Sequence, residues 1–177
     1  MKRPENYDIV QAVGEFEPLE LGGHICVIVQ AEEIITRSNK NALKLYLDIA
    51  EGRQKGYFQK LYDMDERQPK KWGCTYIQLA EGASVGYFKA LITAIEKSNQ
   101  GYIWNWNENT LKGKLVGGVF GREQYKNNKN ELKFATKCIT IRSIYAIIDG
   151  IEAPPDKLFY DTNDDMFVPI YESDIPF

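Results

Sequence analysis

The sequence is poor in the residues that most often build catalytic and metal centres. Its 177 residues include three cysteines and one histidine, and no two cysteines are spaced as Cys-x-x-Cys. We therefore expect Cys26, Cys74 and Cys138 to be reduced thiols in the interior, with no metal site and no cofactor. No apolar run approaches the roughly 20 residues of a membrane span. The first residues also lack the apolar stretch of a signal peptide, so we expect a cytoplasmic protein without membrane contact.

Charge is divided unevenly along the chain, although the net charge is only −3. Residues 37–142 contain 19 basic and 10 acidic residues, whereas residues 154–177 contain one lysine and six acids. A basic body with an acidic tail favours a nucleic-acid partner for the body and a separate role for the tail. The alternative is that the lysines are ordinary solvent-exposed surface residues without a ligand.

The hydrophobic pattern predicts a short lead-in (1–20), a folded body (21–153) and an acidic, proline-punctuated tail (154–177). Alternation and β-branched runs predict strands, and a change to spacings of three and four predicts one amphipathic helix. The helix spans 84–98, with Ser84 as its N-cap and a stop at 99–101. The expected strands are 24–35, 43–49, 56–62, 115–120 and 134–148, with a short extended piece at 75–79.

Three strands, one helix and two further strands form the order of the OB-fold, an all-β barrel with a helix between strands 3 and 4. The paired glycines at 117–118 predict a bulge or sharp bend in the fourth strand. In this fold, oligonucleotides cross strands 2 and 3 between the loops that join strands 1 to 2 and 4 to 5. Those loops are 37–41 and 125–131 here, and both combine basic residues with asparagines.

A surface for single strands needs cations for phosphates and aromatic faces for bases. The predicted strands and loops interleave these two kinds of side chain along the expected binding face. Trp104 and Trp106, after the helix, are expected to cap the bottom of the barrel. The candidate nucleic-acid contacts are Arg37, Lys40, Lys44, Tyr46, Phe58, Lys60, Tyr62, Lys70, Lys71, Trp72, Phe120, Arg122, Tyr125, Lys126 and Lys129.

The last four residues of the sequence, Asp174, Ile175, Pro176 and Phe177, follow an acidic stretch. This ending resembles the C-terminal tip of bacterial single-stranded-DNA-binding proteins, although Phe167-Val168-Pro169-Ile170 makes the tail less densely acidic. The resemblance implies that these four residues dock on replication or recombination enzymes. The tail could also occupy the basic groove and be released when DNA binds.

The body resembles phage-encoded proteins of Gram-positive hosts that are described as single-stranded-DNA-binding. This resemblance covers most of residues 20–150 and implies an OB-fold, single-stranded DNA as ligand and a role in phage DNA replication, recombination or repair. It gives no residue-level motif and leaves the oligomeric state open, a homo-oligomer included. The stretches that carry it are 56–62, 71–73, 88–99, 101–106 and 111–117.

Other functions remain as alternatives on the sequence alone. An RNA-binding or strand-annealing OB protein needs the same stacking and phosphate contacts. A protein-interaction module on an OB barrel is a further alternative, which the basic body disfavours. Asp63, Asp65 and Glu66 could suggest a nuclease, but they share one charged loop that also contains Arg67. We therefore expect a non-catalytic protein.

Overall fold

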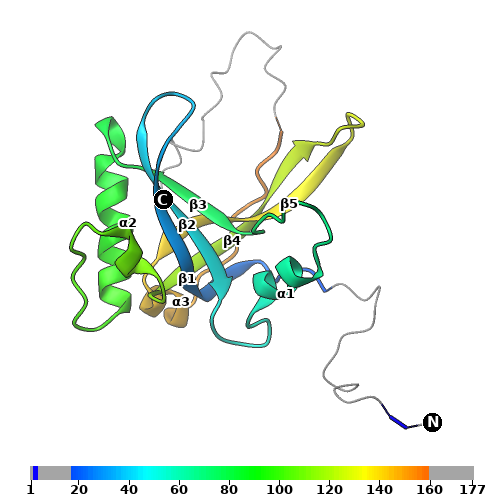
Figure 1. Ribbon diagram of the computed structural model, residues 1–177, viewed down its shortest axis with the longest axis horizontal. Coiled ribbons are helices and arrows are strands. Elements are labelled where there is room, and N and C mark those ends of the chain that lie inside the picture. Colours follow the sequence, from blue (N-terminus) through cyan, green and yellow to red (C-terminus); the bar gives the residue numbers. More distant parts are fainter. Residues whose placement is uncertain (1, 4–16, 160–177) are drawn as a thin grey trace.

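The computed structural model describes residues 2–3 and 17–159, which form one mostly β structure with three short helices. Five antiparallel strands make one sheet in the order β3-β2-β1-β4-β5 (Figure 1). Helix α2 lies along one side of the sheet, and α1 lies at the other side. The elements are β1 (Gly22–Ile35), β2 (Asn41–Ile49), α1 (Tyr57–Met64), β3 (Thr75–Leu79), α2 (Val85–Ser98), β4 (Leu115–Lys126), β5 (Leu132–Arg142) and α3 (Ile144–Asp149), with single 3-10 turns at Gly82–Ser84 and Glu108–Leu111.

Strands β1 and β2 form the predicted hairpin around the turn at 36–40. Leu45 and Leu47 are fully buried, whereas Lys44 and Tyr46 point away from the core and are half-buried. This period of two confirms the predicted half-buried strand. The hairpin therefore presents one apolar face to the core and one polar face outward.

The strand predicted at 56–62 is wrong, because these residues form helix α1. Gly56 takes a left-handed φ of 72°, which turns the chain into the helix. Asp48 then accepts hydrogen bonds at 2.8 Å from the backbone nitrogens of both Ile49 and Phe58. Phe58 and Leu61, three residues apart, pack on the core from one helical face. The third strand is instead β3, the short extended piece predicted at 75–79.

Helix α2 confirms the predicted amphipathic helix, and Ile95 on its inner face is fully buried. Ser84 occupies the N-cap position, but its side chain makes no capping hydrogen bond. At the other end, the Asn99 side-chain nitrogen donates to Ile95 O (2.7 Å) and to Leu115 O (2.8 Å). Asn99 thus ends the helix and fastens it to β4. Within the described residues, no helix has both the length and the apolar character needed to span a membrane.

Strand β4 is longer than predicted, and β5 is shorter. The register between them shifts between Val119 and Phe120, directly after the glycine pair. A Cβ at Gly117 would lie 2.5 Å from the Ile147 side chain, so this glycine admits α3 against the sheet. The strand predicted through 148 ends at Arg142, because the Ser143 hydroxyl accepts from Ala146 N (3.4 Å) and caps α3.

The first residues of the predicted tail pair with β4. Lys157 N donates to Arg122 O (2.9 Å), and Gln124 N donates to Lys157 O (2.8 Å). This parallel pairing uses the stretch of β4 beyond Phe120, the last β4 residue that pairs with β1. Residues 154–159 therefore belong to the folded body, and the rest of the predicted tail lies outside the described residues.

The three cysteines are buried and free, as predicted. Burial raises the pKa of the Cys26 thiol to about 12 and raises the pKa values of Cys74 and Cys138 well above their ordinary range. The thiols therefore stay protonated and behave as small apolar core residues.

Candidate nucleic-acid interface

The outer face of the β1–β2 hairpin carries a compact polar group made of Glu32, Lys44 and Tyr46. The strand register places Glu32 directly opposite Lys44, and Gln30 opposite Tyr46. Lys44 Nζ lies 3.7 Å from Glu32 Oε1 and 4.8 Å from the centre of the Tyr46 ring. The Tyr46 hydroxyl donates to the same carboxylate oxygen. The two residues predicted to contact nucleic acid are thus held together by a third that was not predicted.

The electrostatics of this group keep the lysine charged. Its contacts with Tyr46, followed by those with Glu32, raise the pKa of Lys44 above its ordinary value, although partial burial acts in the opposite direction. Lys44 is therefore a fixed cation beside an aromatic face. A cation next to a stacking surface is the pairing that single-strand binding uses.

The turn between β1 and β2 extends this face. Thr36 N donates to Lys40 O at 2.9 Å, and Asn39 takes the left-handed φ of 59° that closes the turn. Arg37 and Lys40 are exposed, and their side chains form no ion pair with any described residue. These two cations are accessible to an anionic ligand.

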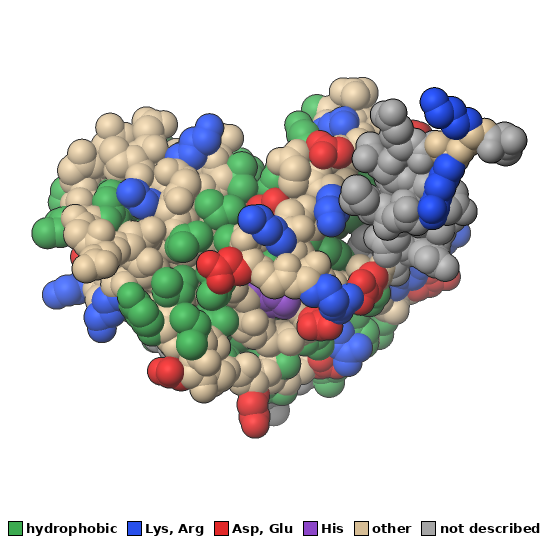
Figure 2. Space-filling view, turned by 90° about the horizontal axis from the view of Figure 1, so that it is seen from below, with side chains coloured by type: hydrophobic (Ala, Val, Ile, Leu, Met, Phe, Trp, Pro, Cys, Tyr) green, Lys and Arg blue, Asp and Glu red, His purple; other side chains and the backbone are tan. Residues whose placement is uncertain are grey.

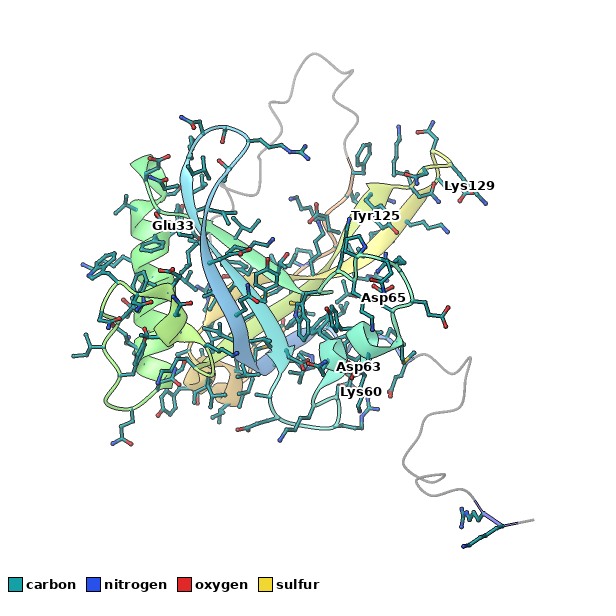
Figure 3. All side chains as sticks on the ribbon, in the orientation of Figure 1. Glu33, Lys60, Asp63, Asp65, Tyr125 and Lys129 are labelled. Carbon is teal, nitrogen blue, oxygen red and sulfur yellow. The ribbon has the colours of Figure 1, made fainter. Side chains whose placement is uncertain are left out.

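The β4–β5 hairpin carries the second predicted basic loop and projects beyond the rest of the sheet (Figure 1). The Asn127 side-chain oxygen accepts from Lys129 N and Glu131 N, both at 2.9 Å, which shapes the turn. Lys129 lies at the tip, and Tyr125 lies further down the strand with 42% of its surface exposed (Figure 3). The hairpin thus offers the Lys129 cation and the Tyr125 ring to solvent, together with Phe134 on β5.

Two further predicted cations of β4 are engaged by the segment 154–159. The Arg122 guanidinium forms a two-pronged ion pair with Asp156, with Nε 2.9 Å from Oδ1. The same guanidinium lies 5.0 Å from the centre of the Phe134 ring. Lys126 Nζ lies 5.2 Å from the centre of the Phe159 ring. A ligand that uses these cations must compete with the protein's own side chains.

The loop after α1 contains three of the predicted nucleic-acid contacts, and two of them form hydrogen bonds within the protein. Lys70 Nζ donates to the carbonyl oxygens of Tyr62 (3.1 Å) and Asp63 (3.4 Å), which places a cation at the end of α1. Trp72 Nε1 donates to Leu47 O (2.8 Å), and its ring packs against Tyr62. These side chains fasten the loop to β2. Lys71 remains exposed beside them.

Phe58 and Phe120 are a correction to the predicted interface, because both lie in the core. Phe58 is 5% exposed and Phe120 is not exposed, and their rings stack with centroids 6.1 Å apart. Neither ring can reach a base without unfolding. Lys60 is exposed on α1, away from the hairpin that carries Lys129 (Figure 3). These three residues therefore lie outside the candidate interface.

The end of the molecule opposite the two basic loops differs from the loop-bearing end in its distribution of charged side chains. Figure 2 shows basic and acidic side chains interspersed there, without a continuous basic track. Hydrophobic side chains gather toward the side that carries α2 in Figure 1. On that side Trp104 and Trp106 pack on Phe88, and Trp106 is 76% exposed. The candidate interface is therefore the loop-bearing end of the sheet.

The carboxylates that could suggest a nuclease do not converge. Asp65 binds the side chain and the backbone nitrogen of Arg67, and these contacts hold the pKa of Asp65 well below its usual range. Asp63 instead accepts from the Gln59 side chain at 2.9 Å. Among the described residues, no group of three or more His, Cys, Asp or Glu side chains could hold a metal ion.

Sequence reasoning missed Glu32, Asp156 and Phe134. Glu32 could have been found by counting outward from the predicted turn, since the hairpin register puts it opposite Lys44. Asp156 and Phe134 depend on tertiary contacts that no local pattern contains. No family model matches the chain, and no curated protein matches it.

Proposed function

We propose that this protein binds single-stranded DNA, without catalysis, across an OB-type barrel. The order of elements supports the barrel, because α2 lies between β3 and β4 in a sheet of five antiparallel strands. The two ends of the sheet, β3 and β5, also contact each other. Relative to the fold drawn from the sequence, α1 is an additional helix between β2 and β3.

The observation that carries the proposal is the pair Lys44–Tyr46 on the outer face of β2. Tyr46 supplies a ring for base stacking, and Lys44 supplies a fixed charge for a phosphate. Strand β2 is the part of an OB-fold over which oligonucleotides lie. Stacking of a base on one aromatic side chain contributes about 1–3 kcal/mol. The pair is therefore chemically suited to bind one nucleotide of a single strand.

The two basic loops support a longer binding track. Arg37 and Lys40 stand at one end of the β1–β2 face, and Tyr125 and Lys129 stand on the β4–β5 hairpin. Contacts to phosphates make binding independent of sequence and sensitive to salt. We propose that a single strand passes between these loops over Lys44 and Tyr46.

The biological role rests on the two resemblances. We propose that the protein coats single strands during phage-type DNA replication or recombination. Asp174, Ile175, Pro176 and Phe177 would recruit partner enzymes. These four residues lie outside the described part of the chain, so their role rests on the sequence alone.

The test is a fluorescence-anisotropy titration of labelled oligo-dT at two salt concentrations, with a duplex of equal length as the control. We expect the single strand to bind more tightly, with log K falling by about 0.7 per neutralised phosphate for each unit of log salt. Lys44→Ala should weaken binding, whereas Lys60→Ala should leave the affinity unchanged. Absence of single-strand binding, or equal effects of the two substitutions, would contradict the proposal.

A further inference from the structure

The outer face of the β1–β2 hairpin contains a negative charge at the position where the proposed ligand needs positive charge. Glu32 lies between the two residues proposed to bind the strand, in ionic contact with Lys44 and accepting a hydrogen bond from Tyr46. The carboxylate is partly open, with 38% of the side chain exposed. An anion approaching Lys44 from solvent therefore meets Glu32.

The contacts that hold this carboxylate are those that would hold a phosphate oxygen. A lysine ammonium and a tyrosine hydroxyl both donate to it, and both groups also donate to phosphate. Lys44 lies directly across the strand pair from Glu32, and Tyr46 lies on the diagonal, where a long side chain can reach. Two donors on one strand thus converge on one anion from the neighbouring strand.

We propose that Glu32 occupies the place of a DNA phosphate in the free protein and that the bound strand displaces it. This inference rests on the proposed function, because it assigns a competing residue to the same site. Glu32 then lowers the affinity of every ligand at this position by one constant factor. A ligand with few other contacts, such as a mononucleotide, falls below the threshold for binding. A strand that also reaches Arg37, Lys40 and Lys129 retains enough affinity.

Displacement of Glu32 also affects how strongly binding depends on salt. In the free protein Lys44 is already neutralised by Glu32, so a phosphate that replaces the carboxylate releases few counterions at this lysine. Without the carboxylate, Lys44 attracts counterions that binding must release. Removing the charge of Glu32 should therefore strengthen binding and also make it more sensitive to salt.

The test compares Glu32→Gln with Glu33→Gln in the full chain, using labelled oligo-dT over a series of salt concentrations. Glutamine at 32 still accepts the hydrogen bond from Tyr46, so the fold is retained. Glu33 is exposed on the same strand (Figure 3), and the strand register places it opposite Leu43 rather than Lys44. Its substitution changes the net charge equally. We expect Glu32→Gln to bind about fivefold tighter at low salt. Its slope should steepen by up to about 0.7, beyond any change in Glu33→Gln.

Two results would overturn the inference. Unchanged or weaker binding by Glu32→Gln would show that the carboxylate does not compete and instead positions Lys44 or Tyr46. Equal effects of the two substitutions would show that only net charge matters. Each of these requires that the wild-type protein binds oligo-dT. Failure of the wild type to bind would instead overturn the proposed function itself.

Discussion

Tyr46 and Tyr125 differ from Phe58 and Phe120 in surroundings more than in local sequence. Each of the four has a lysine or arginine within two positions. The phenylalanines stack on each other in the core, whereas Tyr46 is half-buried on the outer face and Tyr125 is exposed. The comparison shows that the interleaving of rings and cations does not by itself mark a binding surface. A ring must also lie on a face that the core leaves open.

Removing a phenylalanine ring from the core is expected to have the largest effect and tests this comparison most directly. Phe120→Ala should lower the free energy of unfolding by about 3–5 kcal/mol, because it deletes a fully buried ring and leaves a cavity. Urea denaturation measures this loss. The folded fraction should bind oligo-dT with unchanged affinity. Weaker binding per folded molecule, without a loss of stability, would place Phe120 in the interface after all.

Asp48 shows that part of the outer face of β2 is buried and not exposed to solvent. It shares a strand with Lys44 and Tyr46, yet its carboxylate is buried and accepts two backbone hydrogen bonds beside α1. Asp48→Ala should destabilise the protein by about 2–4 kcal/mol, since two buried N–H groups lose their acceptor. Thermal or urea unfolding provides the measurement, and Asp63→Ala on the exposed side of α1 is the control. Similar small losses of stability in the two variants would contradict the structural role of Asp48.

The buried thiols predict that the free energy of unfolding falls at alkaline pH. Cys26 has a pKa of about 12 in the folded protein, whereas an unfolded thiol ionises near about 8.5. Its contribution to stability is complete below the lower value and is lost as pH rises between the two. The loss is about 1.4 kcal/mol per pH unit for each thiol.

Comparing urea midpoints of the wild type and Cys26→Ala across this alkaline range isolates that one thiol. The wild type should lose stability more steeply with pH than the variant. Parallel pH profiles would show that Cys26 is not protected by burial.

The smallest effect is expected at Arg122 on β4, because this cation already forms an ion pair with Asp156. Asp156→Asn removes the charged partner of Arg122 on an exposed surface, so stability should change little. The freed guanidinium should strengthen oligo-dT binding by a few-fold at low salt, as expected for one additional phosphate contact. Asp149→Asn, an exposed acid on α3, is the control in the same anisotropy assay. Equal affinities of the two variants would argue against a strand contact at Arg122.

The sequence predicted those elements whose periodicity is strong and local. The alternation around Leu45 and the helical spacing around Ile95 are each sufficient for their elements. Helix α1 could not be predicted in this way, because its aromatic residues favour a strand and the deciding hydrogen bond comes from Asp48 on another element. Likewise α3 begins where Ser143 caps a run of isoleucines that reads as a strand.

The same limit applies to the candidate interface. Lys44 and Tyr46 follow from alternation alone, since the opposite face is clearly apolar. Trp72 could not be placed, because its hydrogen bond to Leu47 is a tertiary contact. The pairing of residues 154–159 with β4 was also beyond the pattern, since acidic, proline-rich composition indicates a tail and not a strand.

The central claim is that a single strand stacks on Tyr46 at the outer face of β2. The most direct measurement is photocrosslinking with an oligonucleotide that carries 5-iododeoxyuridine, followed by mass spectrometry of the crosslinked peptides. We expect a crosslink at position 46. The substitution Tyr46→Phe should reduce its yield in part, and Tyr46→Ala should abolish it. Crosslinks confined to the α2 side of the molecule, at Trp104 or Trp106, would contradict the central claim.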